Sequence, residues 1–97
     1  MSLDREELIY WFERKTLLGW PRILSAKSHE ERRVRRVAIW SFVNFLNHNP
    51  NDIGKIFGFA ARQSIFRILR SKNLSDDEYN LRRELQACLR SRKNQAA

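Results

Sequence analysis

The stretch NPNDIGKIFGFAARQSIFRILR, residues 49–70, predicts two short helices joined by a tight turn. Asn49 is a typical N-capping residue, and Pro50 after it suits the first position of a helix. Gly58 suits the turn, because glycine adopts positive φ without a steric penalty. The pattern is typical of a helix-turn-helix, in which the apolar side of the second helix packs on a scaffold and its polar side enters the major groove of DNA.

The two sides of the second helix differ in residue type. The side that we expect to pack inward carries Ile65, Phe66, Ile68 and Leu69. The opposite side is polar, and we expect it to face the bases of double-stranded DNA through Arg62, Gln63, Ser64 and Arg67. A plain helical hairpin with a solvated basic side is the alternative, because small helical proteins contain many such pairs.

The charge of the chain favours a polyanionic partner. Its 97 residues include 19 basic and 11 acidic side chains, which gives a formal net charge of +8. Cations of this kind replace the counterions condensed on nucleic-acid phosphates. No segment approaches the roughly 18 apolar residues of a membrane span, so we expect no membrane insertion. The length predicts one domain, which we expect in the cytoplasm and at the nucleoid.

Apolar residues recur at helical spacing along the chain, which predicts an all-α fold of six helices. The longest helix should be central, because its apolar stripe from Val34 to Leu46 is wide enough to be contacted from several sides. Gly19 is expected to end the first helix. Capping boxes are expected at Asp4 with Glu7, Ser28 with Glu31, and Ser75 with Glu78. The expected helices cover about Asp4–Leu18, Pro21–Ala26, His29–Leu46, Pro50–Phe57, Ala60–Ser71 and Asp76–Arg92.

A basic run lies around the start of the longest helix. Its five cations, within ten residues, suit contacts with phosphates or an arginine inserted into the minor groove. The alternative is a solvated side that Glu30 and Glu31 partly neutralise. The residues predicted to contact phosphates or the minor groove are Lys27, Arg32, Arg35, Arg36, Lys55 and Arg70.

The segment RRVAIWSFVNFLNHNPNDIGKIFG resembles the C-terminal, DNA-binding domain of the bacterial replication initiator DnaA, and the related Trp-repressor-like fold is also compatible. The likeness covers roughly residues 24–89 and is strongest at Ile53-Gly54, at Phe57-Gly58 and at Ile65. It implies a six-helix domain that binds double-stranded DNA. It also implies a minor-groove contact at Lys27, and phosphate or base contacts at Arg35 and Arg36.

The signature GRDHTT of that family falls on residues 59–64, which read FAARQS here. Alanine cannot form a hydrogen bond to a base, so we expect a conserved scaffold with changed reading residues. Arg62 and Gln63 could then pair bidentately with guanine and adenine. No nucleotide-binding motif G-x-x-x-x-G-K-[ST] is present. A stand-alone DNA-binding protein, or the DNA-binding piece of a transposase or phage protein, fits these features, with a role in transcription, replication or transposition.

We expect no enzyme activity, no cofactor and no metal site. His29 and His48 are far apart and show no metal-ligand spacing. Cys88 is the only cysteine and lies on an apolar stripe, which predicts a buried, inert thiol. Two other functions stay open: a protein-interaction module that binds an acidic partner without reading DNA, and an RNA-binding protein. A homodimer or a larger protein partner also stays open.

Overall fold

The structure, a computed structural model, describes residues 4–58, 62–70 and 74–96, and every regular element in these ranges is an α-helix. For residues 50, 51, 62–64 and 92–96 the description covers the backbone only. The all-helical prediction is confirmed. The described helices are α1 (Arg5–Thr16), α2 (Trp20–Ser25), α3 (His29–Leu46), α4 (Pro50–Phe57), α5 (Arg62–Arg70) and α6 (Asp76–Ala96).

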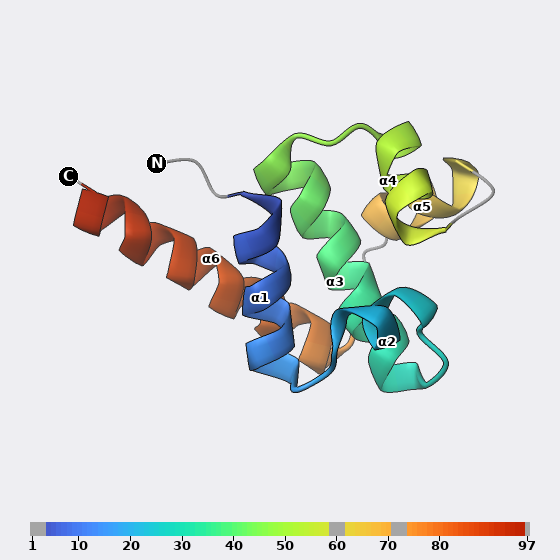
Figure 1. Cartoon of the computed structure of the whole chain (residues 1–97), viewed down its shortest axis with the longest axis horizontal. Coiled ribbons are helices and arrows are strands. Elements are labelled where there is room, and N and C mark those ends of the chain that lie inside the picture. Colours follow the sequence, from blue (N-terminus) through green and yellow to red (C-terminus); the bar gives the residue numbers. More distant parts are fainter. Residues whose placement is uncertain (1–3, 59–61, 71–73, 97) are drawn as a thin grey trace.

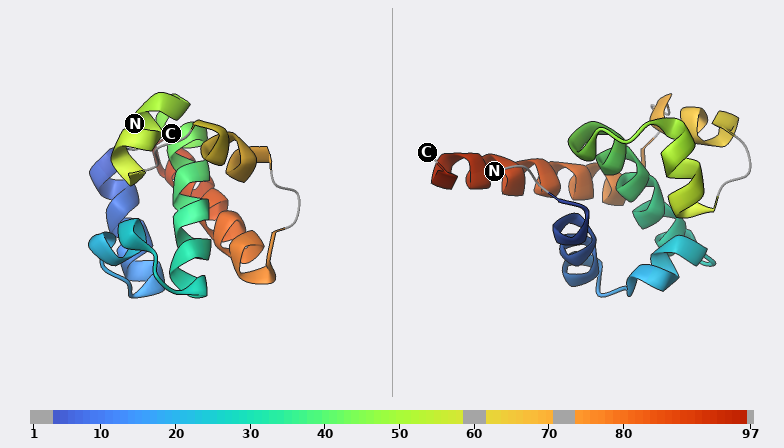
Figure 2. Two further views of the ribbon diagram at one scale, coloured as in Figure 1. Left: turned by 90° about the vertical axis from the view of Figure 1, so that its right-hand side faces the viewer. Right: turned by 45° about the horizontal axis from the view of Figure 1, so that its top comes forward.

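Helix α3 runs through the middle of the molecule and contacts each of the other five helices (Figures 1 and 2). Its inward side chains are fully buried, as the wide apolar stripe predicts. The central position of this helix is therefore confirmed. The residues of α3 with no exposed surface include Val37, Ala38, Ile39, Ser41 and Phe42.

The ring of Phe42 joins three helices. It lies nearly parallel to the Trp20 indole of α2, with ring centroids 5.8 Å apart. The Phe57 ring of α4 meets it edge-on at 5.4 Å. Phe57 also meets Trp20, at 5.6 Å, and the His48 ring stacks on Phe42 at 5.7 Å. Aromatic pairs in such offset and edge-on geometries stabilise beyond the apolar area that they bury, so this cluster fixes α2 and α4 on α3.

The predicted starts of α1, α3 and α6 are confirmed by their caps. The Ser28 hydroxyl accepts the N–H of Glu31 at 3.1 Å, and the Glu31 carboxylate accepts the N–H of Ser28 at 3.0 Å. Ser75 and Glu78 form the same reciprocal pair at 3.1 and 3.2 Å. The Asp4 carboxylate accepts the N–H of the third helical residue of α1 at 2.8 Å. Each cap satisfies N–H groups that a helix start leaves without intrahelical partners.

The end of α1 differs from the prediction. The helix ends at Thr16 rather than Leu18, and Leu17 adopts a left-handed conformation with φ of 60°. The Thr16 hydroxyl accepts the N–H of Leu18 at 3.3 Å, so a side chain takes over a backbone group that would otherwise continue the helix. Gly19 does not end α1 as expected. It caps α2 instead, in an extended conformation, and α2 therefore begins at Trp20.

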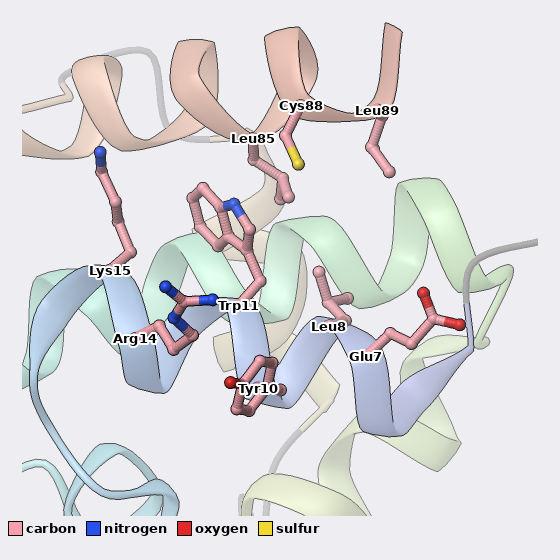
Figure 3. A pocket seen from close by; sticks show the side chains of 9 residues that line it. All are labelled: Glu7, Leu8, Tyr10, Trp11, Arg14, Lys15, Leu85, Cys88 and Leu89. Atoms are coloured by element: carbon pink, nitrogen blue, oxygen red, sulfur yellow. The ribbon is translucent and has the colours of Figure 1, made fainter. Parts of the chain in front are cut away.

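Helix α6 is longer than predicted and continues to Ala96 instead of ending near Arg92. No glycine or proline follows Gly58 in the sequence, so nothing in this part of the chain forces the helix to stop. The start of α6 packs on α3, while its C-terminal half projects beyond the other helices (Figures 1 and 2). Helices α1 and α6 face one another across a groove (Figure 3).

We expect Phe42→Ala to lower the free energy of unfolding by about 3–5 kcal/mol, because it removes a fully buried ring from the joint of three helices. Phe66→Ala is the matched control, because 37% of Phe66 is exposed. This control should cost less than about 1 kcal/mol. Urea unfolding followed by far-UV circular dichroism measures both changes, and equal losses in the two variants would contradict the role given to Phe42.

Candidate nucleic-acid interface

Helices α4 and α5 form the predicted pair of short helices at the end of the molecule opposite the C-terminus of α6 (Figure 1). The Asn49 side chain caps α4 by accepting the N–H of Asp52 at 2.9 Å. Gly58 ends α4 with φ of +75°, and a Cβ there would meet nothing within 4 Å. The backbone angle, not lack of space, is thus what favours glycine at this turn. Both helices contact α3 and each other, so the pair sits on a fixed scaffold.

The inward side of α5 is formed by Ile65, which is buried, and by the half-buried Ile68 and Leu69. The prediction that Phe66 belongs to this side is wrong. Phe66 lies about 100° around the helix from Ile65, and the other three apolar residues already occupy the contact with the core. Its ring is 37% exposed and carries the Arg70 guanidinium at 5.8 Å from the ring centroid.

Of the four predicted base-reading residues, only Arg67 has a described side chain, and it is exposed. The side chains of Arg62, Gln63 and Ser64 lie outside the described part of the structure, although their backbone forms the first turn of α5. The Phe59-Ala60-Ala61 segment, where the initiator signature would begin, also lies outside it. The assignment of these residues to base contacts therefore stays a prediction.

Positive charge accumulates on the α4–α5 pair because no acidic residue occurs between Asp52 and Asp76. In the described part of the chain, no ion pair involves Lys55, Arg67 or Arg70, and all three are exposed. Their charges are consequently available to a partner from outside the chain.

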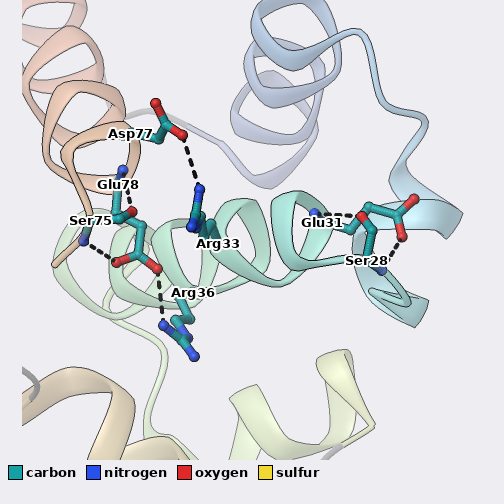
Figure 4. A network of polar contacts seen from close by, with 7 residues as sticks. All are labelled: Ser28, Glu31, Arg33, Arg36, Ser75, Asp77 and Glu78. Atoms are coloured by element: carbon teal, nitrogen blue, oxygen red, sulfur yellow. Dashed lines mark hydrogen bonds and ion pairs between the residues drawn. The ribbon is translucent and has the colours of Figure 1, made fainter.

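The basic run on α3 divides into cations with structural partners and cations without. Arg33 pairs with Asp77, and Arg36 with Glu78, both at 3.2 Å (Figure 4). Glu78 is only 1% exposed, so Arg36 supplies the positive charge that a buried carboxylate needs. The predicted phosphate contact at Arg36 stays a prediction, but this guanidinium already joins α3 to α6.

Arg35 also makes a contact within the fold. Its Nη1 atom donates to the backbone carbonyl of Leu24 at 3.4 Å, which links α3 to the end of α2. Burial, followed by the nearby charges of Arg32 and Arg36, lowers the pKa of Arg35 from its ordinary value. The half-buried Arg35 thus differs from the exposed Arg32 beside it, although both belong to the same predicted phosphate-contacting side.

Glu31 shapes the turn that carries Lys27. Its carboxylate accepts the backbone N–H groups of Lys27 and Ser28, and it also pairs with Nε of Arg22 at 3.2 Å. These two backbone hydrogen bonds are the main cause of a lowered pKa at Glu31, although its burial acts in the opposite direction. The sequence indicated the cap, but it did not indicate the ion pair with Arg22 on another helix.

Five exposed cations without an ion pair in the described part of the structure lie on α4, on α5, in the turn before α3 and in the first turn of α3. We call them the interface cations. Among the described residues, no cluster of histidine, cysteine or acidic side chains could hold a metal ion, and no helix has the length and apolarity needed to cross a membrane. The interface cations are Lys27, Arg32, Lys55, Arg67 and Arg70.

We expect Glu31→Gln to remove a pH-dependent part of the stability. Because the pKa of Glu31 is lowered in the folded protein, its contribution is fully present above the ordinary value of 4.5 and is lost as the pH falls below it. The difference in unfolding free energy between wild type and variant should therefore shrink between about pH 5 and about pH 3. Urea unfolding across this range measures it, and a difference that does not change with pH would contradict the assignment.

Comparison with known proteins does not assign the chain to a family. No family model, no curated protein and no solved structure matches the chain.

Proposed function

We propose that this protein binds double-stranded DNA, with α5 in the major groove, Arg67 facing the bases and the other four interface cations on the phosphate backbone. The observation that carries the proposal is that some cations form ion pairs within the described fold, whereas the interface cations do not. Ion pairs of the described residues engage Lys15, Arg22, Arg33 and Arg36. The interface cations lack such pairs: Lys55, Arg67 and Arg70 lie on α4 and α5, and Lys27 and Arg32 lie at the start of α3. In this proposal their charges attract the DNA.

The geometry of α5 supports a reading role. Its inward side is held by Ile65 against α3, and its described outward side carries Phe66, Arg67 and Arg70. Arginine can pair bidentately with guanine, and an exposed aromatic ring can contact the methyl group of thymine. In this proposal Arg67 reads bases together with Arg62, Gln63 and Ser64 at the start of the helix.

The finer fold assignment belongs to the same proposal. A central helix followed by two short helices with a glycine turn supports a Trp-repressor-like helix-turn-helix domain, similar in layout to the C-terminal domain of DnaA. The biological role would be regulation of transcription, replication or transposition in a bacterium or phage, by binding rather than catalysis. The protein would then act at the nucleoid.

The first test is titration of random duplex DNA, measured by fluorescence anisotropy at several salt concentrations. Four phosphate contacts predict that the logarithm of affinity falls with the logarithm of salt concentration with a slope of about −3 to −4. An acidic protein partner in place of DNA predicts negligible duplex binding even at about 50 mM salt, and that result would overturn the proposal. Single-stranded and duplex RNA of equal length separate an RNA-binding function.

A second test distinguishes residues that contact phosphates from residues that contact bases. Arg32→Ala should weaken binding to all duplexes alike and reduce the salt slope by about 1, because it removes one phosphate contact. Arg67→Ala should instead lose about 1–3 kcal/mol of discrimination at one base pair. Arg83→Ala is the matched control, because Arg83 is an exposed arginine on α6 whose described neighbour is the Tyr79 ring. Equal effects of all three variants would show that net charge alone determines binding.

A further inference from the structure

Among the described residues, four large apolar or aromatic side chains are exposed, and one of them lies on the helix that we place in the major groove. Tyr10 and Tyr79 have a hydroxyl group that can bond to water, and Leu17 belongs to the turn after α1. Cys88, in the groove between α1 and α6, is half-buried, which corrects the expectation of a buried thiol. Phe66 on α5 has no polar group, and 37% of it is exposed. The proposed function therefore has to account for this ring.

The ring of Phe66 lies on the flank of α5, between its inward and its outward side. Successive residues of an α-helix are about 100° apart, so Phe66 lies about 100° around the axis from the buried Ile65. Arg67 lies about 200° from Ile65 and so faces away from α3, and Arg70 lies between these directions at about 140°. The Arg70 guanidinium is 5.8 Å from the centroid of the Phe66 ring. Two arginines therefore border the exposed part of the ring.

The charges around Phe66 favour a polyanion as the partner of this surface. Residues 53–75 include no acidic side chain. Lys55, Arg67 and Arg70 are exposed and have no ion pair within the described residues. Phosphates can take the place of the water around such cations, whereas an apolar protein surface would remove that water without compensation. DNA therefore suits both the cations and a ring that lies among them.

The chemistry of the major groove selects what the ring contacts. Base edges present hydrogen-bond donors and acceptors there, and the C5 methyl group of thymine is the apolar exception. A phenyl ring placed against a donor or an acceptor would remove water from that group without replacing its hydrogen bond. We propose that Phe66 contacts the methyl group of a thymine in or next to the base pair that Arg67 contacts, and so makes the bound site depend on that thymine. The inference rests on the proposed binding of double-stranded DNA through α5.

The spacing of Phe66 and Arg67 suits neighbouring base pairs. Consecutive Cα atoms are about 3.8 Å apart, and consecutive base pairs of DNA are about 3.4 Å apart. The two side chains can therefore reach the same base pair or adjoining ones, while the Arg70 guanidinium beside the ring contacts a phosphate. Uracil lacks the methyl group of thymine, so the same contact favours DNA over RNA.

Replacement of thymine by uracil in a bound duplex tests this contact, because it removes only the methyl group and keeps charge and base pairing. Duplexes that the full chain selects from a random pool are synthesised with uracil at one thymine at a time, and fluorescence anisotropy measures their affinities. At one position, wild type should bind the thymine duplex about four-fold more tightly, the effect of burying one methyl group. Phe66→Ala should bind the two duplexes with equal affinity. Selected sites without thymine, or equal affinities of wild type at every position, would overturn the inference while DNA binding stands.

Two further variants test the assignment to the ring, and both should keep the far-UV circular dichroism of wild type because they change exposed residues. Phe66→Leu keeps an apolar side chain and should retain part of the thymine preference. Arg70→Gln should reduce the salt slope by about 1 and leave the preference unchanged, because it removes a phosphate contact. A thymine preference that persists in Phe66→Ala would assign the methyl contact to another residue and overturn the inference. Negligible binding of every duplex at about 50 mM salt would instead overturn the proposed function, and the inference with it.

Discussion

The packing around the Phe42 ring is the contact on which the rest of the molecule depends. Because Trp20 and Phe57 meet this ring from two other helices, α2 and α4 take fixed positions on α3. The turn after α2 is thereby placed at the same end of the molecule as the helix pair that begins with α4. The positions of two basic segments that are separate in the sequence thus depend on apolar packing, and the second segment contributes Phe57 to that packing.

Two buried carboxylates bind arginines within the described fold and so determine which cations have no ion-pair partner there. Glu31 and Glu78 each cap a helix, and each also takes an arginine from another helix. A buried charge without a partner is costly, so these pairs hold Arg22 and Arg36 in structural positions. Cations outside such pairs keep their full interaction with water and with any polyanion. Such exposed cations also include Arg5 and Arg14 on α1 and Arg83 and Arg90 on α6, which have no ion pair within the described residues.

Local features were predictable from the sequence, and features that depend on tertiary packing were not. Caps at Ser28 and Ser75 involve residues three positions apart, so the pattern alone indicates them. By contrast, the ion pair of Arg36 with Glu78 spans 42 positions, and nothing near either residue identifies the other. The exposure of Phe66 follows the same rule, because residue type assigned it to the apolar side while the rotation of α5 against α3 turned it outward.

The candidate site was predictable as a set of residue types rather than as a geometry. From charge and helical spacing alone, Arg32, Arg35 and Arg36 are predicted to form one patch, since all three lie on one side of α3. The fold separates them, because the neighbouring helices α2 and α6 engage Arg35 and Arg36 from either side and leave Arg32 between them in solvent. A central helix that is covered on several sides leaves only a narrow exposed strip.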